Sequence, residues 1–321
     1  MEYRTIANTD VKVSAVSLGC WTLGGLEYNQ GRMIGWHPVD EQEAVDAIQY
    51  AVDQGVNHFD NADVYGSGRA ERMLGRALEG VSKDVLVSSK VGFFLGTAAH
   101  AYEPHHIRAQ CEQSLINLRR DAIDIYYLHN TNFGENGRYL DGAAEILHRL
   151  KEEGKVRLVG LSGGPSNLVK YVPRVKPDVL QTRATMMDRK ALDPGTAFRK
   201  MCEKRRLQVV CFSPFEQGLL LAKYSSENPP KFERGDVRRG KARFSRKGLA
   251  EIEPKIEKLK ERFGSRNEDL AAACLGFLLA HEHVLSPIPG FRNLAQVRSN
   301  LDAGGRPMDE DGVKFVRDLF A

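Results

Sequence analysis

The sequence predicts a single α/β domain, residues 1–321, folded as a (β/α)8 (TIM) barrel with an N-terminal hairpin and a long loop after the seventh strand. Eight short apolar runs alternate with amphipathic stretches along the chain. This is the pattern of parallel strands that are buried on both faces and covered by helices. An open doubly wound sheet is the alternative, but it commonly has fewer strands. The length of 321 residues is normal for one closed barrel.

Composition and charge narrow the class of protein. A hydrophobic content of 42% and a charged content of 27% are ordinary for a globular enzyme. The net charge of +4 is spread along the chain, so we expect no nucleic-acid partner. No apolar run approaches the roughly 18–20 residues of a membrane helix, and the start MEYRTIANTD lacks an apolar signal segment. The five cysteines include no Cys-x-x-Cys pair, which favours reduced thiols in a cytoplasmic protein.

The elements follow one another in a regular order. The chain opens with a hairpin, YRTIANTDVKVS, which we expect to turn at Asn8–Asp10. The eight expected strands occupy residues 13–20, 56–60, 84–90, 122–129, 156–162, 178–182, 207–213 and 284–290. Helices are expected at residues 41–54, 104–119, 143–153, 166–174, 194–206 and 267–281. The first helix has Asp40 as its N-cap and ends at Gly55.

The interval between the last two strands is unusual. It spans about seventy residues, far beyond an ordinary crossover connection. Residues 214–245 fill much of it and are rich in Gly, Pro, Lys and Arg. We expect a long loop there, of the kind that often covers a ligand on an enzyme.

Polar residues follow three neighbouring strands. Asp60 and Tyr65 come after the second strand, Lys90 ends the third and His129 ends the fourth. Taken singly, each has a commoner structural role as a turn cap, a solvated charge or a hydrogen-bonded histidine. Because the C-terminal strand ends of a barrel carry its active site, their shared position instead predicts one site.

The chemistry of these four residues suits the reduction of a carbonyl group, which needs a hydride on carbon and a proton on oxygen. A phenol has a pKa of about 10, and a nearby ammonium lowers it. We therefore expect Tyr65 to be the acid, with Lys90 tuning it and Asp60 holding the lysine. The imidazole of His129 can donate a hydrogen bond to the carbonyl oxygen and orient it.

Five motifs in the same order carry a family resemblance: FDNADVYG (59–66), LVSSK (86–90), DIYYLH (124–129), CFSPFEQGLL (211–220) and IPGFRNLAQVRSN (288–300). With them the sequence resembles an aldo-keto reductase over essentially its whole length, in the branch of the potassium-channel β-subunit-like and bacterial members. The resemblance implies a nicotinamide cofactor bound without a Rossmann fold. GSGRAE at 66–71 agrees, because it lacks the third glycine and follows no buried strand.

The resemblance also implies where the cofactor binds. Ser162 and Gln181 would bind the nicotinamide carboxamide, and Phe212 would stack on its ring. The pyrophosphate would be wrapped through the long loop by Ser213, Pro214, Gly218 and Leu220. The adenosine end would be held by Gly290, Arg292, Gln296 and Asn300.

Arg292 bears on the choice of cofactor. A guanidinium at the start of a short helix suits a 2′-phosphate, which favours NADPH (NADP+) over NADH. A surface cation is the alternative for this residue. The basic segment DVRRGKARF at 236–244 is expected to close over the cofactor phosphates or to be a solvated loop.

The substrate is expected to be a small carbonyl compound, with Trp21 and Phe133 as candidate pocket walls. Ordinary packing is the alternative for Trp21. The loops that decide specificity do not identify one substrate, nor does the sequence indicate an oligomeric state.

Two other functions would use residues of this sequence in a different way. A metal-dependent hydrolase would use histidines such as His281 and His283, but these precede the eighth strand, at the wrong end of a barrel for a metal site. We therefore expect no metal. The other rival is a redox-sensing auxiliary subunit that binds the cofactor with little turnover. The presence of all four catalytic-type residues favours an enzyme.

Overall fold

The computed structural model describes residues 1–81, 84–302 and 305–321 and confirms the predicted barrel. Eight parallel strands form one sheet in which each strand neighbours the next along the chain. They are β3 (Leu18–Gly19), β6 (His58–Asp60), β7 (Leu86–Val91), β8 (Ile123–Leu128), β9 (Val156–Ser162), β10 (Val179–Arg183), β11 (Val209–Phe212) and β12 (Val284–Ile288).

Backbone hydrogen bonds between the first and last strands close the sheet. Ser17 N donates to Pro287 O over 3.1 Å and Gly19 N donates to Pro289 O over 3.0 Å. Gly19 also forms a parallel bridge with Gly290. The sheet is therefore a ring, as the count of eight apolar runs predicted.

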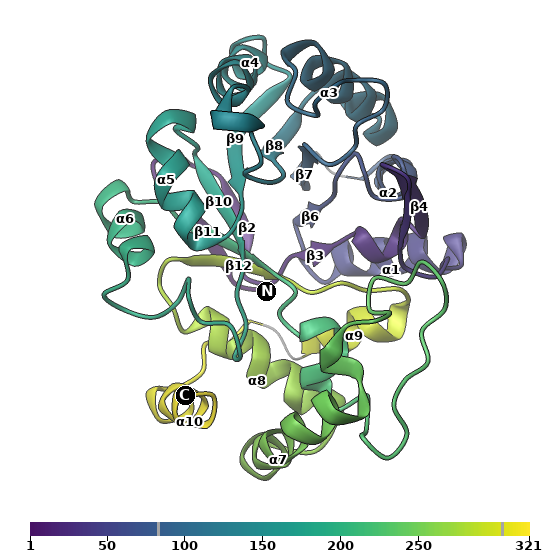
Figure 1. The fold of residues 1–321 in the computed structure, drawn as a ribbon, viewed down its shortest axis with the longest axis vertical. Coiled ribbons are helices and arrows are strands. Elements are labelled where there is room, and N and C mark those ends of the chain that lie inside the picture. The colour runs from purple at the N-terminus through teal and green to yellow at the C-terminus, as the bar shows by residue number, and fades with distance from the viewer. Residues whose placement is uncertain (82–83, 303–304) are drawn as a thin grey trace.

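Helices surround this ring (Figure 1). They are α1 (Glu41–Asp53), α2 (Arg69–Ala77), α3 (Pro104–Leu118), α4 (Leu140–Glu152), α5 (Pro165–Val175), α6 (Ala197–Arg205), α7 (Arg246–Phe263), α8 (Asn267–Leu279), α9 (Leu294–Asp302) and α10 (Glu310–Leu319). Short 3-10 turns occur at η1 (Trp21–Leu23), η2 (Glu135–Gly137), η3 (Glu216–Leu221) and η4 (Ala242–Phe244). The Asp40 side chain accepts a hydrogen bond from Glu43 N and caps α1, as predicted.

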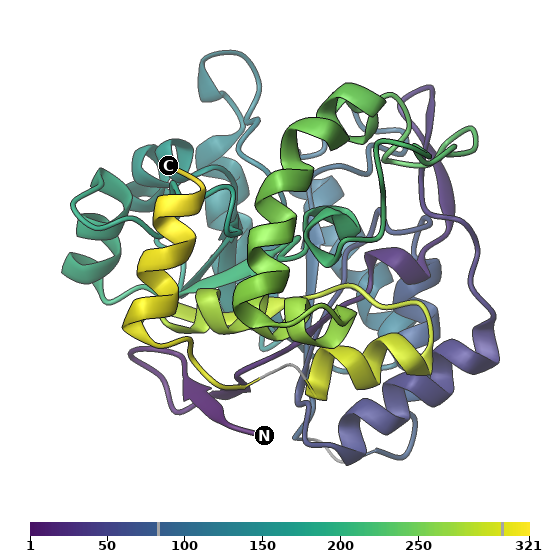
Figure 2. The same ribbon diagram turned by 90° about the horizontal axis from the view of Figure 1, so that it is seen from below.

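Two hairpins lie outside the barrel sheet. The N-terminal one pairs β1 (Tyr3–Thr5) with β2 (Lys12–Ser14) and confirms the predicted hairpin. In Figure 2 it lies at one end of the barrel, and Ile6 and Val13 join the apolar cluster inside the strands. The other hairpin, β4 (Leu26–Asn29) with β5 (Arg32–Gly35), follows the first barrel strand and was not predicted.

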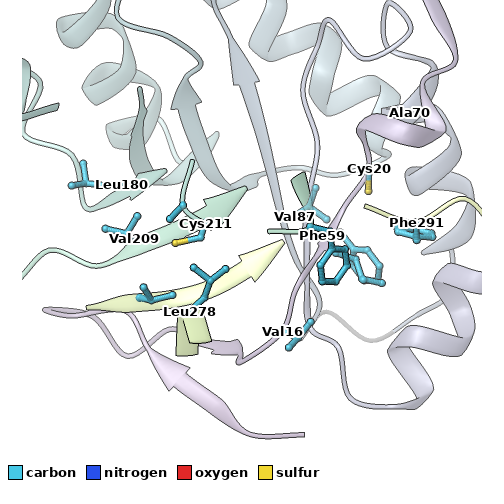
Figure 3. Close-up of a cluster of buried hydrophobic side chains, with 14 of the residues drawn as sticks. Val16, Cys20, Phe59, Ala70, Val87, Leu180, Val209, Cys211, Leu278 and Phe291 are labelled. Atoms are coloured by element: carbon cyan, nitrogen blue, oxygen red, sulfur yellow. The ribbon is translucent and has the colours of Figure 1, made fainter. Parts of the chain in front are cut away.

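The core has an inner and an outer part. Outward-facing residues such as Phe59 and Val87 pack against the helices (Figure 3), while Leu86 and Ile125 lie in the inner cluster. Side chains alternate along a strand, so residues on either side of Phe59 point into the barrel. This alternation delivers the polar residues of β6 and β7 to its interior.

All five cysteines are buried and free, as the sequence led us to expect for reduced thiols. None of the helices in the described segments combines the length and the apolar character that a bilayer span requires.

Candidate active site

A cavity of about 1230 Å³ opens at the C-terminal ends of the barrel strands. Most residues predicted for the site line it: Trp21, Asp60, Tyr65, His129, Ser162, Gln181, Phe212, Ser213, Pro214, Gly218, Gly290, Arg292, Gln296 and Asn300. The cavity is large enough for both a cofactor and a small substrate, since drug-sized ligand pockets measure roughly 300–1,000 Å³.

Lys90 lies behind the cavity wall, and its ammonium group contacts two residues that line the cavity, Asp60 and Tyr65. Its side chain is fully buried, and Nζ donates to Asp60 Oδ2 over 2.6 Å and to Asn61 O over 2.6 Å. Nζ also lies 3.2 Å from the hydroxyl oxygen of Tyr65. The four atoms form a continuous hydrogen-bonded cluster in a site largely screened from water, where such contacts are strong.

The loop that carries Tyr65 is fixed by backbone packing. Gly66 has a φ of +60°, and a Cβ there would lie 2.0 Å from Gly24 O, so only glycine fits. Gly24 directly follows η1, which therefore packs against the Tyr65–Gly66 backbone. The indole of Trp21 in the same turn stacks on the Tyr65 ring with 6.0 Å between centroids. The phenol is thus held by two segments distant in sequence.

The protonation state of Tyr65 differs from the simple expectation. Burial raises the pKa of Tyr65 well above its usual range, and the charge of Asp60 raises it further. The ammonium of Lys90 was expected to lower this pKa. Because Asp60 neutralises Lys90 and the cluster is buried, desolvation dominates. The side chain is therefore a neutral phenol, which is the form a proton donor requires.

His129 completes the group. Burial lowers the pKa of His129 well below its usual range and the charge of Lys90 lowers it further, so the imidazole is neutral. Its ring lies edge-on to Tyr65, with 5.8 Å between centroids, and edge-on to Phe93 at 4.6 Å. Nδ1 has no hydrogen-bond partner among the described residues. Because Nδ1 is buried, a ligand in the cavity that His129 lines would meet the other ring nitrogen, Nε2. A neutral imidazole with its proton on Nε2 can donate one hydrogen bond there.

Three neighbouring strands end beside this cluster. Ser162, the last residue of β9, is paired in register with Gln181 in the middle of β10, and Phe212 ends β11. Gln181 Nε2 donates to Asp60 Oδ1 over 2.7 Å, a contact that the sequence did not suggest. A hydroxyl, an amide and an aromatic ring thus come from three adjacent strands, the set that a flat ring bearing a carboxamide requires.

The cavity extends from there towards β12 and α9. Arg292 N donates to Gln296 Oε1, and its guanidinium donates to the carbonyl oxygens of His37 and Pro38 over 3.3 and 3.2 Å. Asn300 Nδ2 lies 3.4 Å from Gly290 O. The four residues predicted at the adenosine end therefore form one group at the far end of the cavity.

The long loop after β11 is fixed near both of its ends by contacts with other elements. Glu216 is buried and forms ion pairs with Arg183 and Arg243. Further along, Asp236 forms a bridge with Gly35 of β5, and in Figure 2 the loop runs beside the β4–β5 hairpin.

Two basic residues of this loop, Arg238 and Lys241, contact protein partners. The guanidinium of Arg238 pairs with Asp236 over 2.6 Å and lies 4.7 Å from the Trp36 ring. Lys241 Nζ donates to Gln217 Oε1 over 3.0 Å. These contacts hold the loop across the cavity, and both Trp36 and Arg238 line it.

Two predicted residues lie away from the cavity. Phe133 is buried between Tyr102 and Tyr171, with 5.0 Å between ring centroids on each side, so it belongs to the core and not to a pocket wall. Leu220 is fully buried, and its neighbour Leu221 lines the cavity instead.

The structure adds residues that sequence reasoning missed. Glu27, Asn29 and Ile34 of the β4–β5 hairpin and Phe93 after β7 all line the cavity. Their signal was weak, because each lies in a loop with no recognisable motif. Asn130, directly after His129, also lines the cavity and connects two loops, because its side-chain amide donates to Gly92 O over 2.7 Å.

The two histidines that a metal-dependent hydrolase would use form hydrogen bonds with backbone carbonyl oxygens instead. His281 Nδ1 lies 2.8 Å from Phe277 O, and His283 Nε2 lies 2.8 Å from Ala191 O. Both precede β12, at the end of the barrel opposite the cavity.

Comparison with known proteins points to one family. A model of the aldo/keto reductase family matches residues 15–320. An aldo-keto reductase from Schizosaccharomyces pombe, whose name specifies NADP(+), is 27% identical over 316 residues. The match covers 95% of this chain and 88% of the relative. An NADH-specific methylglyoxal reductase from Escherichia coli is 24% identical over 328 residues, covering 98% of this chain and 97% of the relative.

Solved structures show the same fold. A glycerol dehydrogenase from Gluconobacter oxydans superposes with a TM-score of 0.81 at 25% identity, over 99% of this chain and 94% of that one. An aldo-keto reductase from Bacillus halodurans in its holo form gives a TM-score of 0.76 at 24% identity, over 99% and 96%.

Proposed function

This chain belongs to the aldo/keto reductase family, and from that membership and the site we propose that it reduces small aldehydes or ketones with NADPH, using Tyr65 as the proton donor. The observation that carries the proposal is the contact of 3.2 Å between the Tyr65 hydroxyl and Lys90 Nζ, at the wall of a cavity that also contains His129.

Each residue of the cluster has a distinct task in this proposal. Tyr65 gives its proton to the carbonyl oxygen, and the resulting phenolate is stabilised by the ammonium of Lys90. Asp60 keeps that ammonium fixed within 2.6 Å. The neutral imidazole of His129 donates a hydrogen bond to the carbonyl oxygen, which orients the substrate and stabilises negative charge on that oxygen.

The three side chains from β9, β10 and β11 fit the nicotinamide. Ser162 and Gln181 are both nearly fully buried, so their polar groups are held in place for the carboxamide, and Phe212 offers a ring face. When bound, NADPH supplies the hydride. The backbone at Ser213 has a φ of +58° and Gly218 a φ of +91°, which curves the chain around the region proposed for the pyrophosphate.

Arg292 supports NADPH over NADH. Its guanidinium lines the far end of the cavity beside Gln296 and Asn300, where it can pair with a 2′-phosphate. Relatives do not decide the matter, because one carries NADP(+) in its name and another is described as NADH-specific.

The test is an NADPH-oxidation assay of the purified protein over aldehydes, ketones and sugars, run beside Tyr65→Phe. We expect turnover by the parent and a fall in kcat of about 10²–10⁴-fold in the variant, because the phenol is the acid. The Kd for NADPH should stay unchanged. A variant as active as the parent rules out Tyr65 as the donor.

The same assay separates an enzyme from a binding module. Tight NADPH binding without turnover of any carbonyl compound by the parent would favour a redox-sensing auxiliary subunit. Tyr50→Phe is the matched control, since this tyrosine lies on α1 outside the cavity lining.

A further inference from the structure

Below the catalytic cluster the barrel interior contains a second set of polar side chains. His58 lies two residues before Asp60 on β6, and Ser88 lies two residues before Lys90 on β7, so all four face inward. His58 and Ser88 are fully buried. His58 Nε2 lies 3.1 Å from Ser88 Oγ, and Ser88 Oγ donates to Asp60 Oδ1 over 2.9 Å.

The chain continues towards the opposite end of the barrel. His58 Nδ1 lies 2.9 Å from Ser17 Oγ, and Ser17 Oγ lies 2.8 Å from Ser286 Oγ. Ser17 precedes β3 and Ser286 is on β12, so the links cross the seam where the ring closes. Ser286, Ser17, His58, Ser88 and Asp60 form one unbroken series of hydrogen bonds.

Counting protons gives the series a direction. A serine hydroxyl has one proton, and the Asp60 carboxylate beside Lys90 can only accept, so the Ser88 proton points to Asp60. Ser88 Oγ must then accept from His58, which places the imidazole proton on Nε2. Burial lowers the pKa of His58 to about 4, so Nδ1 is unprotonated and accepts from Ser17. The donors from Ser17 to Ser88 therefore all point towards Asp60. Ser286 Oγ, at the far end, also lies 3.2 and 3.3 Å from the carbonyl oxygens of Ala15 and Pro287, which compete with Ser17 for its proton.

We propose that His58 is a positioning residue of the reaction: acting through Ser88, it fixes and stabilises the Asp60 carboxylate as the counter-ion of Lys90. The inference rests on the proposed function, because it concerns the same proton donor. A fixed carboxylate holds the ammonium 3.2 Å from the Tyr65 oxygen. Hydrogen bonds to a charged acceptor in a buried site are the strong ones, and polarised chains strengthen them further.

Other titratable groups face this cluster from neighbouring elements. Burial raises the pKa of Cys20 after β3, of Tyr127 on β8 and of Asp63 after β6, which favours their neutral forms. The His129 imidazole is neutral as described above. Glu27 on β4 differs, because burial raises its pKa only to about 7. It titrates within the range of an activity profile, so that profile is best measured in a Glu27→Gln background as well.

Three variants test the inference. His58→Leu removes both ring nitrogens, Ser88→Ala removes the single oxygen that contacts Asp60, and His58→Gln keeps a donor directed at Ser88. We expect His58→Leu and Ser88→Ala to lower kcat about 10-fold or more, the scale of a lost charge-assisted hydrogen bond. KM for the carbonyl substrate should change by less than about twofold, because neither side chain lines the cavity.

The pH profile gives the decisive readout. With a donor lost from the series, the Lys90–Asp60 pair beside the Tyr65 hydroxyl is less firmly fixed, so the pH profile of kcat should differ from that of the parent in both variants. His58→Gln should recover most of the activity and the parent profile. A purely structural role for the series would lower the melting temperature without moving the profile.

A buried histidine elsewhere supplies the matched control. His283 is also buried and hydrogen-bonded, to Ala191 O, but at the far end of the barrel. His283→Leu should lower the melting temperature and leave kcat and the pH profile unchanged.

The outcomes distinguish the two proposals. If Tyr65→Phe is inactive while His58→Leu and Ser88→Ala keep the parent kcat and pH profile, this inference is overturned and the proposed function stands. If Tyr65→Phe is fully active, both are overturned. Should His58→Leu fail to fold, Ser88→Ala decides alone, since it deletes one atom and leaves the core otherwise filled.

Discussion

The side-chain amide of Gln181 donates a hydrogen bond of 2.7 Å to Asp60 Oδ1. The contact spans the barrel interior from β10 to β6, so a residue proposed to bind the nicotinamide touches the carboxylate proposed to hold Lys90. Ser88 donates to the same oxygen. The proposed cofactor site and the proposed proton-delivery cluster therefore share one acceptor atom.

Replacing Gln181 should disturb both tasks. Gln181→Leu removes a donor from Asp60 and a partner from the carboxamide, so we expect kcat and NADPH affinity each to fall about 10-fold. Steady-state kinetics and a fluorescence titration with NADPH measure the two effects. If only the affinity for NADPH falls and kcat is unchanged, the contact between Gln181 and Asp60 does not contribute to catalysis.

Breaking the buried ion pair should cost stability as well as activity. Lys90→Met leaves the Asp60 carboxylate buried without its cation, so we expect the free energy of unfolding to fall by about 3–5 kcal/mol. The double variant Asp60→Asn/Lys90→Met should regain most of that stability and remain inactive. Urea denaturation checks this. A double variant as unstable as Lys90→Met would contradict the explanation.

Glu27 should make stability depend on pH. Burial raises its pKa from 4.5 to about 7. Between these values the folded chain keeps a proton that the unfolded chain releases, so the stabilising effect is full below pH 4.5 and is lost as the pH rises through 7. Glu27→Gln does not titrate and still accepts from Gly66 N. At about pH 8 it should be more stable than the parent by on the order of 1 kcal/mol, after allowance for partial solvent screening.

Thermal unfolding of Glu27→Gln and the parent at several pH values measures this difference. The two curves should converge near pH 4.5, where the parent carboxyl is protonated in the folded state. A difference that is constant across pH would mean that Glu27 is not the titrating group.

Arg292 should determine the cofactor preference. Without its guanidinium the 2′-phosphate loses a charge-assisted partner, so Arg292→Leu should weaken NADPH binding about 10–100-fold and leave NADH binding nearly unchanged. Arg298→Leu is the control, since Arg298 is an exposed cation on α9, the helix that begins two residues after Arg292, and lies outside the cavity lining. Equal losses for both cofactors would place the 2′-phosphate elsewhere.

The barrel and the cluster around Tyr65 could be predicted because their signals are local. Parallel strands buried on both faces are continuous apolar runs, and the strand ends identify the active face without knowledge of the packing. Asp60, Lys90 and His129 were found because each directly ends such a run.

Elements without a clear period were missed. The β4–β5 hairpin turns at Gln30 and Gly31, both with positive φ, which is the conformation that Asn-Gly usually signals. Its strands expose Tyr28 and Met33, so no alternation of apolar and polar residues marked them. Helix α7 has Ser245 as its N-cap but contains Pro254, a residue that normally argues against a helix.

Contacts between distant segments could not be predicted at all. Phe133 was expected in the pocket because of its place after His129, yet the loop folds back and buries it against Tyr171 on α5. The raised pKa of Glu27 and the hydrogen bond from Gln181 to Asp60 likewise depend on the packing of segments that are distant in the sequence. Propensity and period describe one segment at a time and carry no information about such partners.

The closure of the sheet between β3 and β12 limits how the two sides of the barrel can move relative to each other. In the proposed mechanism the proton groups belong to one arc of the ring, β6 to β8, and the cofactor groups to the other, β9 to β12. A ring of hydrogen-bonded strands has no free edge and no hinge, so the two arcs cannot separate or rotate independently. The distance between the two reactants is therefore a fixed property of the strands, and new substrates can be accommodated by altering the surrounding loops alone.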